Sequence, residues 1–268
     1  MNAGSYQFEQ LESRHIESSF LAERAQLRLE DFPQLLTRHE FPTHGKILEV
    51  GTGHGLRARI MAEKFPHTEI IGIDRSEELL KIARQHPHSI PNLSFIEADL
   101  YELPFEPESF DFIYARLVWM HLTNPVGAIQ HLKQFLKPGG RILIEDADRD
   151  CMFFEPSPPH FPSFWNKVQE AQRKLGGDPN VGRKLTPYLK ETGFEQIITE
   201  TQPIIGAGKE IEFLARTLMP SLNLYLEPID RLDGEKAINE LDQLSQDPRA
   251  TFYHFWFAVS GKKSVRDK

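Results

Sequence analysis

The stretch Lys46-Ile47-Leu48-Glu49-Val50-Gly51-Thr52-Gly53-His54-Gly55 decides the fold that this sequence predicts. It reads as a short apolar strand, a carboxylate, three glycines at alternate positions, and then a helix over residues 56–65. Glycine has no Cβ and adopts positive φ freely, so such a loop lets the backbone come close to a ligand. The pattern therefore predicts a strand-to-helix turn that carries a binding site.

A second apolar run, Ile70-Ile71-Gly72-Ile73, ends in Asp74. The carboxyl ends of parallel strands meet at one edge of an open α/β sheet, and this is the edge where such sheets bind ligands. A carboxylate there is placed to accept hydrogen bonds from the hydroxyl groups of a ribose. Asp74 and the glycine loop together indicate a cofactor that contains adenosine.

The glycine spacing and the preceding acid bear on which cofactor binds. The dinucleotide fingerprint G-x-G-x-x-G aims a helix N-terminus at a pyrophosphate, but here the third glycine comes one residue early. Glu49 would repel a pyrophosphate and attract a cation. S-adenosylmethionine carries a sulfonium and an ammonium, so these residues favour it over NAD. The alternative is a glycine-rich turn that binds no ligand.

Three later segments continue the alternation of strands and helices. Residues 93–100 predict a third strand, which ends in Asp99, and residues 110–116 predict a fourth strand. In residues 136–144, a Pro-Gly-Gly turn leads into a fifth strand. The series resembles the class I S-adenosylmethionine-dependent methyltransferases, over roughly residues 45–200 plus the final strand. Within that class it is similar to the small-molecule branch, which includes the ubiquinone and menaquinone biosynthesis enzymes.

The resemblance implies a role for each part of the predicted edge. The glycine loop would line the methionine end of the cofactor, Asp74 would hold the ribose, and Asp99 and Leu100 would bind the adenine. The loop residues are Glu49, Gly51, Thr52, Gly53 and Gly55, and the other predicted cofactor contacts are Arg75, Ala98, Ala115 and Arg116. Arg116 is also open to two further roles, namely binding a substrate anion or pairing with Glu49 or Asp111 in the scaffold.

The predicted fold is a seven-stranded, mostly parallel, Rossmann-like α/β sheet with a helical cap. Residues 1–44 predict an N-terminal helical segment, and residues 45–268 predict the methyltransferase domain. By the resemblance, the aromatic run 251–259 is a seventh strand, antiparallel between the fifth and sixth. Insertions at about 151–181 and 203–250 are expected to cover the methyl acceptor, with edge packing or a homodimer interface as the alternative.

His121, which follows the fourth predicted strand, is the candidate general base. Transfer of a methyl group from a sulfonium depends on alignment, and a base helps only when the attacking atom carries a proton. The alternative is a histidine that only hydrogen-bonds its loop. The segment 176–185 is likewise open to two interpretations, a hinged lid or a simple connector.

A metal site is one possible role for the acidic residues after the fifth predicted strand, which are Glu145, Asp146 and Asp148. A metal needs carboxylates that converge from neighbouring strand ends, and the fourth strand ends in Ala115-Arg116, which offer no oxygen ligand from their side chains. The sequence therefore predicts no metal. Orientation of a substrate by Glu145 or Asp146 remains open.

The composition limits the function classes. The chain has 268 residues and a net charge of −8, which argues against a nucleic-acid partner. Its single cysteine suits a reducing compartment, and the sequence shows no signal peptide and no apolar span long enough to cross a membrane. We therefore expect a cytoplasmic protein without membrane contact. Its methyl acceptor is expected to be a small molecule. A nicotinamide-dependent oxidoreductase and a noncatalytic cofactor-binding protein are the alternatives. Neither the acceptor nor the choice among O-, N- and C-methylation can be read from the sequence.

Overall fold

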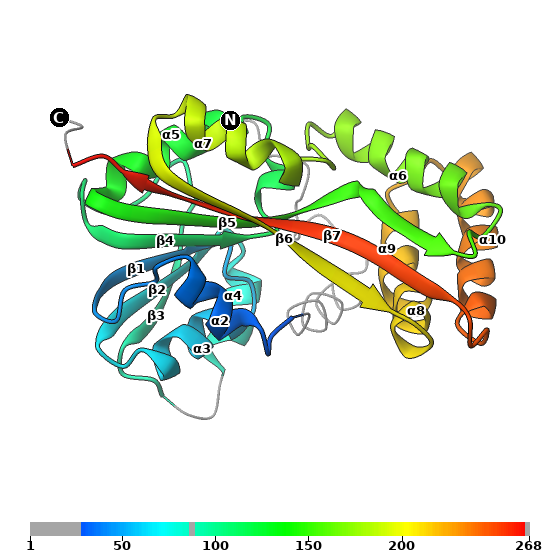
Figure 1. Cartoon of the computed structure of the whole chain (residues 1–268), viewed down its shortest axis with the longest axis horizontal. Coiled ribbons are helices and arrows are strands. Elements are labelled where there is room, and N and C mark those ends of the chain that lie inside the picture. Colours follow the sequence, from blue (N-terminus) through cyan, green and yellow to red (C-terminus); the bar gives the residue numbers. More distant parts are fainter. Residues whose placement is uncertain (1–27, 86–88, 266–268) are drawn as a thin grey trace.

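The computed structural model describes residues 28–85 and 89–265, and one seven-stranded sheet runs through it (Figure 1). The strand order is β3-β2-β1-β4-β5-β7-β6, and β7 is antiparallel to both of its neighbours. The other neighbouring pairs are parallel. This order confirms the predicted α/β sheet and the insertion of the last strand between the fifth and sixth. The strands are β1 (Gly45–Val50), β2 (Thr68–Asp74), β3 (Leu93–Glu97), β4 (Phe110–Arg116), β5 (Leu136–Glu155), β6 (Phe194–Gly206) and β7 (Thr251–Lys263).

Helices cover both faces of the parallel part of the sheet. Figure 1 shows α2, α3 and α4 on one face and α5 and α7 on the other. For the helices that connect parallel strands, this change of face is what right-handed crossovers require when the strand order reverses at β1. These helices are α2 (Phe32–Arg38), α3 (Leu56–Lys64), α4 (Glu77–Arg84), α5 (Pro125–Phe135) and α7 (Leu185–Glu191). In the described part of the chain, none of the helices has the length and apolar character needed to cross a bilayer.

Local signals in the sequence explain where several helices begin. Ser76 Oγ accepts a hydrogen bond from the Leu79 amide at 3.3 Å, and the Asn124 side chain accepts one from the Gly127 amide at 2.9 Å. Pro33 stands in the first turn of α2, where a missing N–H costs nothing. The rest of the predicted N-terminal helical segment, up to residue 27, lies outside the described residues.

Strands β5, β6 and β7 continue past the parallel core, and this corrects the expected end of the fifth strand near Ile144. Glu145, Asp146 and Asp148 lie within β5 and not in a loop after it. The strand continues because β7 pairs with it on both sides of a bulge between Ala147 and Met152, which satisfies the backbone groups.

The extended strands carry a second lobe, which we call the cap lobe. It consists of their outer parts together with α6 (Phe161–Lys174), α8 (Lys209–Phe213), the π-helical segment Leu214–Leu218, α9 (Met219–Asn223) and α10 (Pro228–Leu244). The two predicted insertions meet there in one hydrophobic cluster, to which Met152, Phe164, Leu214 and Phe252 contribute. Helical spacing of apolar residues in 209–223 and in 228–244 accounts for the segments on either side of the turn before Pro228.

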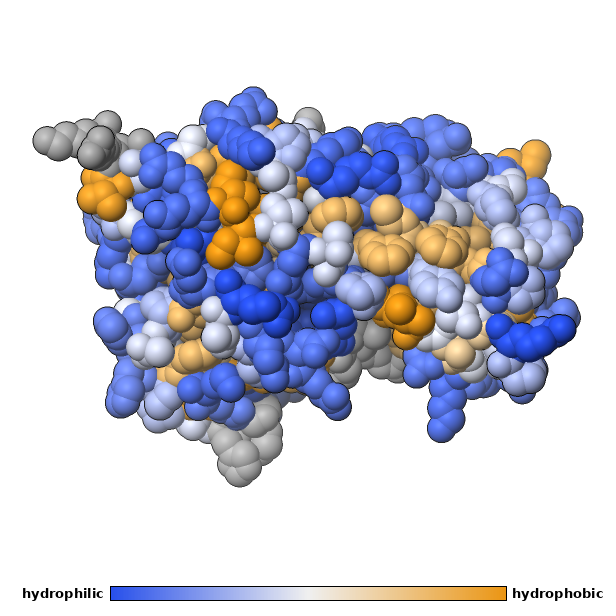
Figure 2. Space-filling model, viewed as in Figure 1, coloured by the Kyte–Doolittle hydropathy of each residue, from blue (hydrophilic) through white to orange (hydrophobic). Residues whose placement is uncertain are grey.

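The side chains of the extended strands alternate between two faces. Met152 and Phe154 are buried in the cap cluster, so Phe153 points to the opposite face, where it is 50% exposed and stacks on Tyr253. Ile205, on β6, pairs with Tyr253 in register and is 61% exposed. Figure 2 shows apolar surface over this outer part of β5, β7 and β6.

The cap cluster gives a prediction about stability. Phe164 is fully buried, so Phe164→Ala should lower the free energy of unfolding by about 3–5 kcal/mol in urea denaturation. Leu175, at the end of the same helix, is 50% exposed, and Leu175→Ala should change the free energy of unfolding by less than about 0.5 kcal/mol. Equal losses in the two variants would contradict the assignment of Phe164 to the core.

Candidate active site

The glycine loop and Asp74 meet at the carboxyl edge of the sheet, where the strand order reverses between β1 and β4. The Asp74 carboxylate accepts hydrogen bonds from the Gly53 amide at 2.8 Å and from the Ser76 amide at 3.0 Å. The Thr52 amide donates to the Ile73 carbonyl at 2.9 Å. Asp74 therefore fixes the loop to β2 and to the start of α4. A carboxylate at this strand end is also of the type that binds the hydroxyl groups of a ribose.

The three loop glycines all have positive φ but serve different purposes. A Cβ on Gly51 would lie 2.4 Å from the Val118 side chain, and one on Gly55 would lie 2.4 Å from the Phe95 ring. A Cβ on Gly53 would meet no protein atom within 4 Å. Gly51 and Gly55 are thus required by packing inside the protein, whereas the space beside Gly53 is open to a ligand.

Glu49 is buried at the start of the loop. Its side chain is 4% exposed and accepts a hydrogen bond from the Thr52 hydroxyl. Burial raises the pKa of Glu49 to about 7, against the opposing effects of the Thr52 hydrogen bond, the nearby Arg57 and the Ala58 amide. A carboxyl group with a pKa near 7 gains its negative charge when a cation approaches, so this position favours a cationic ligand.

The predicted adenine contacts lie just after β3. The strand ends at Glu97, so Asp99 stands in the following turn and not at the strand end as expected. The Ala98 amide donates to the Asp74 carbonyl at 3.0 Å, which brings this turn to the Asp74 edge. Asp99 is exposed and accepts a hydrogen bond from the Tyr101 amide at 2.9 Å, which holds the turn.

The other predicted contacts of the cofactor flank this edge. Arg75 follows Asp74 and is exposed, Leu100 is half-buried after Asp99, and Ala115 is fully buried near the end of β4. The structure therefore gathers the predicted residues at the ends of β1, β2, β3 and β4 along one edge of the sheet.

Arg116, the last residue of β4, lies with its guanidinium carbon 4.7 Å from the centroid of the Trp256 ring. Of its predicted scaffold partners, Asp111 pairs instead with Lys137 at 2.7 Å. The contact with Trp256 adds β7 to the site. Sequence reasoning identified this tryptophan only as part of a buried strand, because a partner so distant in the chain leaves no local signal.

The turn that carries His121 is held from three sides. The Met120 amide donates to Asp146, which is fully buried, at 3.1 Å. The Met120 carbonyl accepts hydrogen bonds from the Asp178 amide at 2.9 Å and from Gln172 Nε2 at 2.8 Å. Asp146 therefore shapes this turn through a backbone contact, and His121, in the 3-10 turn Trp119–His121, stands on a fixed backbone.

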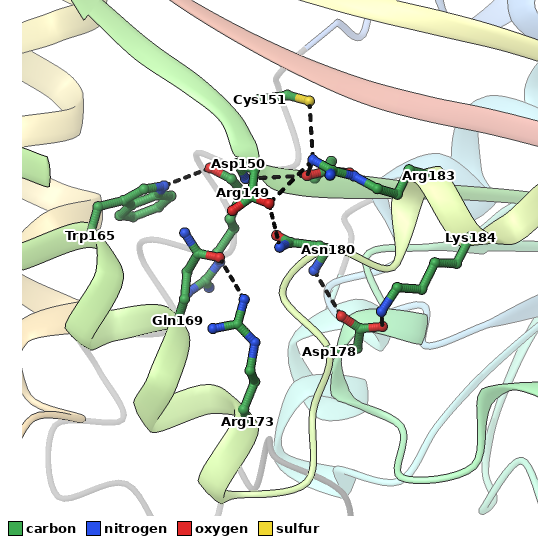
Figure 3. A network of polar contacts seen from close by, with 11 residues as sticks. Arg149, Asp150, Cys151, Trp165, Gln169, Arg173, Asp178, Asn180, Arg183 and Lys184 are labelled. Carbon is green, nitrogen blue, oxygen red and sulfur yellow. Dashed lines mark hydrogen bonds and ion pairs between the residues drawn. The ribbon is translucent and has the colours of Figure 1, made fainter.

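Figure 3 shows that the segment 176–184 is tied to the bulge of β5. Asn180 donates to Asp150 at 2.8 Å, and Arg183 binds the fully buried Asp148 through two nitrogens. The Arg149 amide donates to the carbonyl of residue 179 at 3.0 Å. These contacts favour the connector over the hinged lid, the two interpretations that the sequence leaves open.

The single cysteine of the chain, Cys151, lies at the same bulge of β5. Burial raises the pKa of the Cys151 thiol, which keeps it protonated and unreactive at neutral pH. Among residues 28–85 and 89–265, no group of three or more His, Cys, Asp or Glu side chains is arranged to hold a metal ion.

Comparison with known proteins gives consistent results. The profile of a methyltransferase domain matches residues 43–193. An uncharacterized methyltransferase of Schizosaccharomyces pombe is 35% identical over 205 residues, which are 72% of each protein. A malonyl-[acyl-carrier protein] O-methyltransferase of Ilyobacter polytropus is 33% identical over 108 residues, 40% of this chain and 41% of that relative, so the aligned part spans less than half of that enzyme.

A solved structure supports the fold. It is a phosphoethanolamine N-methyltransferase of Haemonchus contortus in complex with phosphomonomethylethanolamine and S-adenosylhomocysteine. The TM-score is 0.58 at 22% identity, and the match covers 88% of this chain and 53% of that one.

The open space beside Gly53 gives a prediction. Gly53→Ala should weaken binding of S-adenosylmethionine about tenfold or more in calorimetry, because the new methyl group would occupy space meant for the ligand. Gly139 also has positive φ, and a Cβ there would meet only ordinary contacts at 3.7 Å or more, so Gly139→Ala is the matched control. Both variants should lose about 1–2 kcal/mol of stability from backbone strain. Normal affinity in Gly53→Ala would show that no ligand approaches there.

Proposed function

This chain belongs to the methyltransferase-domain family, and from that premise we propose that it transfers a methyl group from S-adenosylmethionine to an O, N or C atom of a small metabolite. The single observation that carries the proposal is the open space at Gly53, beside the Asp74 carboxylate. Glu49 supplies negative charge for a cationic cofactor, and Asp99 lies at the same edge. The net charge of −8 and the absence of a membrane-crossing helix from the described residues support a small-molecule acceptor.

The residues of the site would act mainly by positioning. S-adenosylmethionine supplies a methyl group that is already electrophilic, so alignment of the attacking atom accounts for much of the rate. Asp74, itself held by two amides, would fix the ribose, and the Thr52–Glu49 pair would bind near the charged end. The rigid turn before His121 would hold the imidazole at the edge that the methyl acceptor approaches.

Calorimetry with S-adenosylmethionine, S-adenosylhomocysteine and NAD tests the proposal. We expect both adenosyl ligands to bind and NAD to bind much more weakly, since Glu49 repels a pyrophosphate. Tighter binding of NAD would instead support the oxidoreductase. A metabolite screen with labelled methyl donor then separates an enzyme from a noncatalytic binding protein, because only the enzyme transfers label.

The proposal also concerns the cellular location and the oligomeric state of the protein. A cytoplasmic location is supported by the single cysteine, whose raised pKa suits a thiol that stays reduced. A homodimer, the other use expected for the insertions, is tested by sedimentation velocity at two protein concentrations.

The pKa of Glu49 gives a prediction about pH. In the free protein this pKa is about 7, and a bound sulfonium and ammonium should lower it by favouring the carboxylate. The free protein then holds more protons than the complex near neutral pH, so binding releases a proton and tightens as the pH rises. We expect the dissociation constant of S-adenosylmethionine to fall by up to about tenfold from about pH 6 to 8. Glu49→Gln should remove the trend, and an unchanged trend in that variant would assign it to another group.

His121 gives a prediction about turnover. If the attacking atom carries a proton, His121→Ala should lower turnover by about 10²–10⁴-fold, with the affinity for S-adenosylmethionine nearly unchanged. His67, which is exposed before β2, supplies the control variant His67→Ala, whose turnover should match that of the original protein. A loss below about threefold in His121→Ala would place this histidine in the scaffold.

A further inference from the structure

Arg57 is a buried cation in an unfavourable position. It lies in the first turn of α3, directly after the glycine loop, and is only 5% exposed. The N-terminus of a helix carries a partial positive charge, so a cation is disfavoured there. Burial adds the cost of removing the guanidinium from water. Contacts within the protein must therefore offset both costs.

The ring of Phe32 supplies one of these contacts. The guanidinium carbon of Arg57 lies 4.5 Å from the centroid of the Phe32 ring, which attracts cations through its quadrupole. Phe32 is the first residue of α2 and is only 1% exposed, so packing fixes the position of its ring. Helices α2 and α3 lie on the same face of the sheet (Figure 1), and Phe32 shares a hydrophobic cluster with Ala58 and Tyr114.

The Glu49 carboxylate lies beside the same turn of α3. It accepts a hydrogen bond from the amide of Ala58, the residue that follows Arg57. Tyr114, whose ring centroid is 5.4 Å from that of Phe32, stands directly opposite Glu49 in the β1–β4 ladder. Arg57 and Glu49 thus belong to one buried group between the sheet and the start of α3, where little water screens the attraction between their charges.

The other ionisable groups around Glu49 do not replace Arg57. Asp74, on β2, is an acid and disfavours a second negative charge at Glu49. Burial raises the pKa of Tyr114 well above its ordinary value, so this side chain stays neutral. Arg59 interacts with Glu49, but its guanidinium is bound to backbone carbonyls of the loop and of α4. Burial raises the pKa of Glu49, and among the described cations Arg57 opposes this most strongly.

We propose that Arg57, supported by the Phe32 ring, is a positioning residue for the methyl donor, because its charge keeps Glu49 in the carboxylate form that binds the cationic end of S-adenosylmethionine. This inference rests on the proposed function and deepens it by adding Arg57 and α2 to the recognition of the cofactor. Arg57 acts through Glu49. A cation near a cationic ligand also repels that ligand directly, so the net benefit of Arg57 must depend on pH.

The test measures the dissociation constant of S-adenosylmethionine by calorimetry from about pH 6 to 8.5 in the variant Arg57→Met. Without the guanidinium, the pKa of Glu49 rises and its carboxylate forms only at higher pH. We expect binding about threefold or more weaker than in the original protein at pH 7, and within about twofold of it at pH 8.5, where Glu49 is largely ionised in both. A residue that only stabilises the fold, or that binds the cofactor directly, would weaken binding at every pH.

Further variants separate the charge of Arg57 from other effects. Arg57→Lys keeps a cation and should retain most of the affinity at pH 7, while Phe32→Leu should shift the pH dependence as Arg57→Met does, by a smaller amount. Lys64→Gln removes the same charge from the exposed end of α3, and Arg38→Gln frees the other end of α2 from Glu200. Both of these controls should bind within about twofold of the original protein at each pH.

Two results would overturn the proposal. One is a loss of affinity in Arg57→Met that is equal at every pH, and the other is an unchanged pH dependence. If Arg57→Met fails to fold by circular dichroism, Arg57→Gln and Phe32→Leu carry the same test. Isotope-edited NMR of the Glu49 carboxyl group in the free protein, assigned with Glu49→Gln, should show a higher pKa in Arg57→Met. This titration tests the coupling even if the original protein binds no S-adenosylmethionine, a result that would contradict the proposed function.

Discussion

The position of β7 between β5 and β6 is the constraint on which the rest of the structure depends. It runs from Thr251 in the cap lobe to Lys263 at the far end of the parallel core, and it pairs with a neighbour on each side. Its fully buried residues Ala258 and Val259 pack into clusters on opposite faces of the sheet. Without β7, the facing edges of β5 and β6 would lack partners, and these two strands would no longer be held together where they pass from the core into the cap lobe. The cap lobe is therefore a continuation of the sheet, and the strands set its distance from the glycine loop.

The glycine loop is held mainly by backbone hydrogen bonds, which explains why its sequence is so informative. Asp74 accepts two amides, and the Thr52 amide pairs with β2. Such contacts need an acidic residue at one position and glycines where φ is positive, so they can be recognised as a motif in the sequence. The alternation of strands and helices follows from the same kind of local information, since apolar runs and helix caps such as Ser76 and Asn124 recur along residues 45–200. The place of β7 between β5 and β6 was expected only from the resemblance to the class I methyltransferases.

The acidic residues of β5 show where sequence reasoning fails. Glu145, Asp146 and Asp148 were expected to follow the fifth strand, yet all three lie within it and are nearly or fully buried. Each is stabilised by a partner that lies far away in the sequence: Glu145 by the Tyr114 hydroxyl, Asp146 by the Met120 amide, and Asp148 by Arg183. A buried carboxylate is stable only when such partners bind it, and the hydropathy pattern of the sequence does not show which partners these are. The same holds for the contact between Arg116 and Trp256, which joins two strands far apart in the chain.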